Sequence, residues 1–167
     1  MELFVNDRSI GRQQPDRGAD TEYVSVADGG NCRNLTYPPF TFKDVVWQPG
    51  KVKAIGYRNG KKVAEYEVRT PGTPRKLEIS YFESGYPAVK NDLLIAYVSL
   101  KDINGTLVPM NDFPIRLEVK GGRVRGPELF RTEAGVAAFL VETGEGKNLE
   151  LRASGVGMLG AETIRLR

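Results

Sequence analysis

The sequence predicts an all-β protein made of two tandem immunoglobulin-like β-sandwich domains. Short runs in which apolar and polar residues alternate recur along the chain, and no stretch has the 3.6-residue period of an amphipathic helix. Turn residues separate the runs, and 19 glycines and 10 prolines in 167 residues suit many short strands. A proline-rich linker, 70–74, divides the runs into two groups. The predicted domains are therefore 1–72 and 73–167.

The first predicted element is a hairpin over residues 2–11. Asn6-Asp7 lies between a predicted strand and a predicted return strand and is typical of a two-residue turn, because Asn and Asp tolerate positive φ. Such a turn predicts that Leu3 lies opposite Ile10 on one face of the hairpin.

Residues 12–36 are predicted to form a long loop of the first domain. The segment is polar and rich in glycine and aspartate, and a loop this long is unusual in a compact domain. Residues 23–26 have the alternation of a short strand within it. Cys32 lies there too, and we interpret it as an unreactive thiol, because no neighbour guarantees the lowered pKa that reactivity requires.

Residues 40–47 are predicted to form a strand with a kink near Asp44. Its apolar residues end at Trp47, which directly precedes a Gln-Pro-Gly turn. An exposed indole ring is a common platform for sugar rings. The interpretation that we favour is structural, with Trp47 covering the end of the small sandwich.

The second hairpin surrounds Asn59-Gly60, a pair that strongly favours a tight reversal. A two-residue loop would leave charged and apolar side chains mixed on both faces. We therefore predict a three-residue loop, 58–60, with Lys53 opposite Glu65 and Lys51 opposite Glu67. In this register one face collects the apolar and small residues Val52, Ala54, Gly56, Ala64, Tyr66 and Val68.

The second domain is predicted as an immunoglobulin-like sandwich of about seven short strands. Turn residues such as Gly121-Gly122 separate its runs. The alternating residues that we expect in its core are Leu77, Ile79 and Tyr81; Leu94, Ala96, Val98 and Leu100; Ile115, Leu117 and Val119; Ala137, Phe139 and Val141; Leu149, Leu151 and Ala153; Ile164 and Leu166.

Composition excludes several classes of activity. The chain has no histidine and one cysteine, which removes Ser-His-Asp and Cys-His nucleophiles and histidine-ligated or multi-cysteine metal sites. The net charge is +3, but the charges are interspersed, so we expect no nucleic-acid partner. No apolar run approaches the roughly 20 residues of a membrane helix, and the first residues do not begin a signal peptide. We expect neither membrane insertion nor a cofactor.

Two weak motifs are interpreted as structural. The segment that starts at Asp102 resembles the start of a calcium loop, but it lacks the closing glutamate, so we predict a turn closed by the Asp102 side chain. Glu65 and Glu67 share a face, as a pair of catalytic carboxylates would, but in the predicted register each faces a lysine. We therefore predict no catalytic residue and no metal site in this chain.

Two stretches resemble the C-terminal accessory region of bacterial glycoside hydrolase family 2 enzymes, the β-galactosidase group. Residues 2–11 are similar to that region's Glu-Leu-Phe-Leu-Asn-Gly-Lys-Ser-Leu-Gly hairpin, and residues 47–57 resemble its aromatic-x-Pro-Gly strand. Residues 93–109 look like the start of the family's next immunoglobulin-like domain. Asp7 replaces the usual glycine, loop 12–36 is longer than expected, and the strand that normally precedes Glu2 is missing.

The resemblance implies a non-catalytic fragment of an enzyme that degrades polysaccharides or oligosaccharides. The family's two catalytic glutamates lie on a barrel outside these domains, and no residue here matches their motifs. That barrel is the expected partner, and the parent is expected to be exported to the periplasm or cell surface.

Two other functions stay open. The first is a stand-alone carbohydrate-binding module, in which Trp47, Tyr57 and Tyr23 would stack on an oligosaccharide or polysaccharide. The second is a stretch of bacterial surface adhesin, because tandem immunoglobulin-like repeats also build surface stalks.

Overall fold

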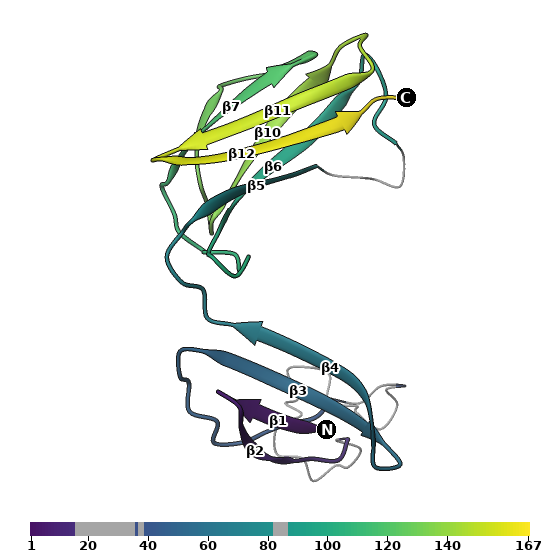
Figure 1. Cartoon of the computed structure of the whole chain (residues 1–167), viewed down its shortest axis with the longest axis vertical. Coiled ribbons are helices and arrows are strands. Elements are labelled where there is room, and N and C mark those ends of the chain that lie inside the picture. The colour runs from purple at the N-terminus through teal and green to yellow at the C-terminus, as the bar shows by residue number, and fades with distance from the viewer. Residues whose placement is uncertain (16–35, 37–38, 82–86) are drawn as a thin grey trace, which may run out of the picture. The chain divides into compact units, whose positions relative to one another are not determined.

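The computed structural model describes residues 1–15, 36, 39–81 and 87–167, and these residues form antiparallel sheets (Figure 1). The described residues contain no helix, so the predicted all-β fold class is confirmed. Within those ranges there is accordingly no helix long and apolar enough to cross a membrane.

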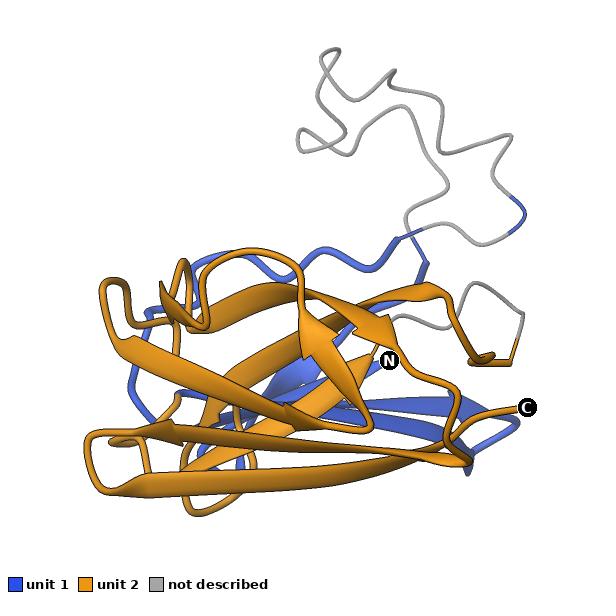
Figure 2. Ribbon diagram, turned by 90° about the horizontal axis from the view of Figure 1, so that it is seen from above, with its two compact units in different colours: residues 1–70 blue, residues 71–167 orange. Residues whose placement is uncertain are grey.

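The chain divides into two compact units, unit 1 (residues 1–70) and unit 2 (residues 71–167) (Figure 2). The hydrogen bonds that backbone amides donate on either side of this boundary stay within their own unit. The Thr70 amide donates to the carbonyl oxygen of Gly50 at 2.7 Å, within unit 1. Two residues later, the Gly72 amide donates to Oδ2 of Asp102 at 2.9 Å, within unit 2. Each end of the linker is therefore fixed to its own unit.

Unit 1 contains a four-stranded antiparallel sheet in the order β2-β1-β3-β4. Its strands are β1 Glu2–Val5, β2 Arg8–Arg12, β3 Lys51–Arg58 and β4 Lys61–Arg69. The β1–β2 turn has positive φ at Asn6 (50°) and Asp7 (65°), as the two-residue turn requires. The predicted pairing of Leu3 with Ile10 is wrong. A bulge between Leu3 and Phe4 shifts the register, and Leu3 lies opposite Gly11.

The predicted three-residue loop of the β3–β4 hairpin is wrong, but the residues predicted to share its apolar face do so. Arg58 pairs with Lys61, so the loop has two residues, and the extra residue forms a bulge beside Gly56 and Tyr57 instead. Lys53 consequently faces Glu67 rather than Glu65, and Lys51 faces Arg69. Because the total shift is two residues, side chains keep their faces. The pairs on the predicted apolar face are Val52 with Val68, Ala54 with Tyr66, and Gly56 with Ala64.

The segment before β3 is not the strand that the sequence predicts. Residues 40–47 have no regular secondary structure. Asp44 has φ 57°, which places a sharp change of direction where the kink was expected. Alternation alone was misleading here, because a strand also needs a partner for its backbone groups.

Unit 2 is a sandwich of two four-stranded sheets, β5-β6-β10-β8 and β12-β11-β7-β9 (Figure 1). The order matches an immunoglobulin-like sandwich, whose A, B, E and D strands form one sheet and whose G, F and C strands form the other. The strands are β5 Lys76–Tyr81, β6 Leu93–Lys101, β7 Pro114–Lys120, β8 Gly122–Val124, β9 Leu129–Arg131, β10 Val136–Thr143, β11 Asn148–Gly155 and β12 Met158–Arg165.

The core of unit 2 is made of the alternating residues that the sequence singles out. All of them are buried in one cluster except Tyr81 and Val119, which are partly buried and pack against it. Val108 joins the cluster from outside the strands. The three-residue strands β8 and β9 carry no alternation long enough to detect. With them, the described residues of this unit form eight strands.

Candidate functional site

Trp47 lies in the irregular segment just before β3 and is 75% exposed. An indole this open does not cover the end of a sandwich, so the structural interpretation of Trp47 is wrong. Its neighbour Val46 is also exposed. The segment therefore presents an apolar, aromatic surface to solvent, and the prediction that Trp47 stacks on a sugar stays a prediction.

Tyr57 belongs to a polar cluster on the β1–β3 side of unit 1. Its hydroxyl donates to Oε2 of Glu2 at 3.1 Å, and the Arg12 guanidinium lies over its ring, 4.7 Å from the centroid. Glu2 also accepts from the Ser9 hydroxyl at 2.8 Å and from Nε of Arg12 at 3.0 Å. One face of the Tyr57 ring is thus occupied by a cation.

The same contacts keep Glu2 ionised. The Ser9 hydrogen bond, followed by those from Arg12 and Tyr57, holds the pKa of the Glu2 carboxyl below its ordinary value, although burial acts in the opposite direction. A general acid in a glycosidase needs a raised pKa. Glu2 therefore has the charge of a structural ion-pair member rather than of a proton donor.

The predicted stacking residues are not brought together. In the described part of the chain, Trp47 and Tyr57 make no ring contact with each other, and the ring pair that does touch is Phe130 with Phe139 in unit 2. Tyr23 lies outside the described residues, as does Cys32.

The carboxylates of β4 are paired, but not with the predicted lysines. Glu65 forms an ion pair with Lys62, and Glu67 pairs with Arg69 at 2.7 Å. The contact with Lys62 is the main cause that lowers the pKa of Glu65. Lys51 and Lys53 instead reach Oδ1 of Asp7, at 2.7 and 3.7 Å. The shifted register places Glu67 opposite Lys53 and Arg69 opposite Lys51, so neither predicted pair faces across the strands.

The Asp102 loop is a turn closed by the aspartate side chain, as predicted. Oδ1 of Asp102 accepts from the amides of Asn104 at 2.9 Å and Thr106 at 2.8 Å, while Oδ2 accepts from Gly72. The residue is 1% exposed. Its oxygens are occupied by protein N–H groups, and no group of three or more metal-ligating residues exists among the described residues.

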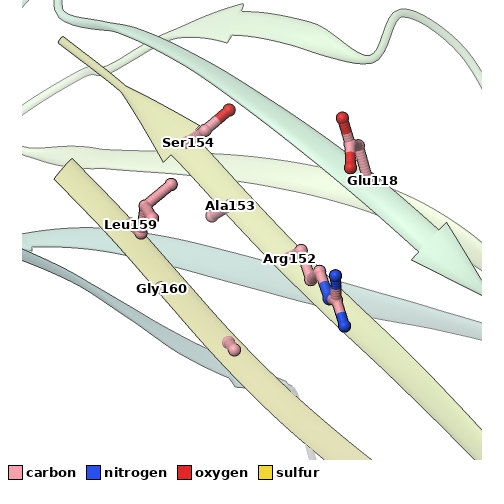
Figure 3. A pocket seen from close by; sticks show the side chains of 7 residues that line it. Glu118, Arg152, Ala153, Ser154, Leu159 and Gly160 are labelled. Atoms are coloured by element: carbon pink, nitrogen blue, oxygen red, sulfur yellow. The ribbon is translucent and has the colours of Figure 1, made fainter. Parts of the chain in front are cut away.

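Sequence reasoning missed an open depression of about 640 Å³ on the β12-β11-β7-β9 sheet of unit 2 (Figure 3). Polar lining comes from Glu118, Arg152 and Ser154, and apolar lining from Leu159 and Ala161. The pairing of the last two strands could have indicated this depression. Leu159 lies opposite Ser154, and the next residues along its strand, Gly160 and Ala161, are small. Donors, acceptors and an apolar edge suit binding of a polar ligand. Glu118, however, is the single carboxylate in the lining, whereas glycoside hydrolysis uses a pair of carboxyl groups.

Comparison with known proteins gives consistent matches. Residues 1–64 match a family model described as a domain of unknown function, DUF4982. The chain is 30% identical over 153 residues to a β-galactosidase from Thermoanaerobacter pseudethanolicus, covering 86% of this chain and 19% of that protein. It is also 31% identical over 121 residues to the β-galactosidase BoGH2A from Bacteroides ovatus, covering 72% of this chain and 12% of that protein.

Solved structures share the fold over nearly the whole chain. A glycosyl hydrolase family 2 member from Bacteroides cellulosilyticus matches 99% of this chain with a TM-score of 0.71 and 18% identity. A β-glycosidase from Bacteroides vulgatus matches 99% with a TM-score of 0.70 and 18% identity. In both cases the match covers 21% of the solved chain.

The chain matches only a small part of each relative. It spans about a fifth of the length of the first β-galactosidase and less of the second. The hairpin and Pro-Gly motifs of unit 1 lie within residues 1–64, which match the family model, and the strand order of unit 2 agrees with the immunoglobulin-like expectation. The resemblance predicted from the motifs is confirmed, and the chain corresponds to the C-terminal accessory β-sandwich domains of glycoside hydrolase family 2 enzymes of the β-galactosidase group.

Proposed function

We propose that this chain is a non-catalytic accessory region of a glycoside hydrolase family 2 enzyme that acts on β-galactosides. The observation that carries the proposal is the asymmetry of the match, which covers 86% of this chain but 19% of a β-galactosidase. Most of such an enzyme therefore lies outside the matched region. The catalytic barrel is then the partner of this chain, and the parent works in the periplasm or at the cell surface.

The chemistry of the described residues supports an accessory role. Retaining and inverting glycosidases both place two carboxyl groups around the scissile bond, one of them with a raised pKa. The depression on unit 2 is lined by a single carboxylate, Glu118. In unit 1 the contacts around Glu2 and Glu65 lower their pKa values. Lowered values favour ionised, structural carboxylates over a general acid.

The test is hydrolysis of a chromogenic β-galactoside by the purified chain and by the intact parent protein. We expect turnover by the parent and none by the chain alone. Turnover by the pure chain that disappears in Glu118→Gln would refute the accessory role, because it would place a working acid or nucleophile here. A parent that hydrolyses no galactoside would refute the proposed substrate class.

A second function, carbohydrate binding, is favoured by the exposed Trp47. Indole rings that are open to solvent can stack on sugar rings without any rearrangement of the protein. Calorimetric titration with galactans is the test, with Trp47→Ala as the key variant. Tyr66→Ala is the matched control, because it removes another exposed aromatic ring of unit 1. Binding lost in Trp47→Ala and kept in Tyr66→Ala supports the module, whereas equal binding by both excludes Trp47 as the platform.

A further inference from the structure

One face of the unit 1 sheet is apolar but only partly covered. Cross-strand pairs place its members side by side, with Val5 opposite Val52 and Tyr66 opposite Ala54. We call it the apolar face of unit 1, and its residues are Leu3, Val5, Val52, Ala54, Gly56, Ala64, Tyr66 and Val68. None of these side chains is charged.

Exposure rises steadily across this face. Val5, on β1, is 5% exposed, whereas Val68 and Tyr66, on β4, are 49% and 73% exposed. A sheet that alternates apolar and charged residues normally buries the apolar side. Here the described residues leave the β4 half of that side open, which is the signature of a missing neighbour rather than of a solvent-facing surface.

The opposite face of the sheet carries paired charges and a buried apolar side chain, Ile55. It carries the ion pairs of Lys51 with Asp7, Lys62 with Glu65 and Glu67 with Arg69. Ion pairs that are open to solvent contribute little to stability. Ile55, 9% exposed, also lies on this charged face, so the exposed valine and tyrosine side chains of the hairpin's apolar face, Val68 and Tyr66, are the ones available for further packing.

Charges at the margin of the apolar face are positive. Arg8 lies directly opposite Val5, and Arg58 lies opposite Lys61 at the tip of the hairpin. The acidic residues of the β3–β4 hairpin, Glu65 and Glu67, both lie on β4 and on the other face. In the described part of the chain, Arg58 and Lys61 therefore have no carboxylate beside them on their own face of that hairpin. A complementary surface would be apolar at its centre and acidic at its edge.

The arrangement argues against a second copy of this chain as the occupant. A stable dimer buries about 800 Å² from each partner, contributed by roughly 20–30 residues, and this face has eight. Pairing two copies through it would also bring the cationic margins together. A domain in the same polypeptide needs less area, because covalent linkage raises its effective concentration.

We infer that the apolar face of unit 1 is the docking surface for another part of the parent polypeptide, which presents an apolar patch edged by carboxylates. The inference rests on the proposed function, since it takes this chain as part of a longer enzyme. The β-galactosidase relatives supply such polypeptide, with about four-fifths of the first one lying outside the match. The contact would bury Tyr66 and Val68 and place carboxylates beside Arg58 and Arg8.

Thiol labelling distinguishes the possible occupants. In a Cys32→Ser background, Tyr66→Cys probes the docking surface and Val156→Cys, at a position in unit 2 that is likewise 73% exposed, serves as the matched control. We expect Tyr66→Cys to react with a maleimide about tenfold more slowly in the intact parent than in the isolated chain. Val156→Cys should react equally fast in both. Val68→Cys repeats the measurement if Tyr66→Cys does not fold.

Two outcomes would overturn the inference. Equal reactivity of Tyr66→Cys in chain and parent means that nothing docks there. Protection already present in the isolated chain means that the occupant is this chain itself, and its dependence on concentration identifies a second copy. Hydrolysis of a chromogenic galactoside is measured on the same intact parent. If the parent hydrolyses the galactoside but Tyr66→Cys is not protected, only the docking surface is refuted. If Tyr66→Cys is protected but the parent hydrolyses no galactoside, only the proposed function is refuted.

Discussion

The two units are built from similar alternating strands but bury them very differently. In its described residues, unit 2 packs two sheets around seventeen buried apolar side chains. Unit 1 has one sheet in the described residues and two buried apolar side chains, Val5 and Ile55. These two lie on opposite faces, because Ile55 pairs with Glu2 and Val5 pairs with Val52.

Alternation of apolar and polar residues therefore predicts which side of a strand is apolar, but not which other element packs against that side. In both units the pattern placed apolar side chains on one side of each strand, and in both the pairing agrees. Among the described residues, a second sheet closes over that side only in unit 2. Unit 2 therefore buries its apolar side chains in one cluster, whereas the described residues of unit 1 leave Tyr66 and Val68 exposed.

The largest expected effect is on the core of unit 2. Phe139, which is 1% exposed and meets Phe130 edge-to-face at 5.3 Å between centroids, fills the centre between the sheets. Phe139→Ala should cost about 3–5 kcal/mol of unfolding free energy, through lost burial and the cavity left behind. Val5→Ala in unit 1 should cost about 1–2 kcal/mol, because two methyl groups are removed. Hydrogen exchange in urea, read separately on β10 and β3 peptides, measures both.

Leu140→Ala serves as the control for the core substitution. Leu140 neighbours Phe139 on β10 but points outward and is exposed. Its replacement should change the free energy by less than about 0.5 kcal/mol. If Val5→Ala proved costlier than Phe139→Ala, the description of unit 1 as the less completely packed unit would be wrong.

A second contrast uses two glycines with the same backbone conformation. Gly60 at the unit 1 hairpin (φ +75°) has open space where a Cβ would sit, whereas at Gly121 in unit 2 (φ +84°) a Cβ would lie 2.4 Å from the Asn148 carbonyl oxygen. Gly60→Ala should cost about 1–2 kcal/mol, from the left-handed conformation alone. Gly121→Ala adds a backbone clash, so its cost should be clearly larger. Urea unfolding of the two variants checks the order, and equal losses would show that packing around Gly121 yields easily.

Much of the fold was predictable because local pattern and final packing agree in unit 2. Leu149 and Leu151, for example, alternate with polar residues and are fully buried. Asn6-Asp7 likewise specified its turn through the positive φ that these residue types tolerate. Strands β8 and β9 were not predictable, since three residues carry no period and their positions depend on neighbouring strands.

The site was less predictable, because its contacts join distant parts of the chain. The contact between Glu2 and Tyr57 depends on β1 pairing with β3, across a sequence separation of 55 residues. Lys53 acquired a different partner because a bulge, rather than the loop, absorbed the extra residue of the hairpin. Bulge position is set by sheet geometry and has no short sequence signal. Exposure of Trp47 likewise depends on what packs around its segment.

The smallest expected effects come from two carboxylates that collect hydrogen bonds, one in each unit. Asp102 accepts from three backbone amides, and the Gly72 amide is the main cause that holds the pKa of its carboxyl below the ordinary value of 3.8. The ionised form therefore stabilises unit 2 above pH 3.8, and this contribution is lost as the pH falls through the lower pKa of the folded protein. Asp102→Asn should lower the melting temperature of unit 2 at neutral pH and flatten its decline in acid.

Glu2→Gln in unit 1 makes the matched comparison. The Glu2 carboxylate accepts from the side chains of Ser9, Arg12 and Tyr57, which can turn toward water when it is replaced. Backbone amides around Asp102 are fixed by the chain and cannot turn toward water as a side chain can, so the loss of their acceptor costs more. Scanning calorimetry between about pH 2.5 and 7 should therefore show a larger loss for Asp102→Asn than for Glu2→Gln. A larger loss for Glu2→Gln would mean that the stability of unit 1 depends more on its polar cluster than the stability of unit 2 depends on the Asp102 turn. The two units would then differ in their hydrogen bonding rather than in their burial.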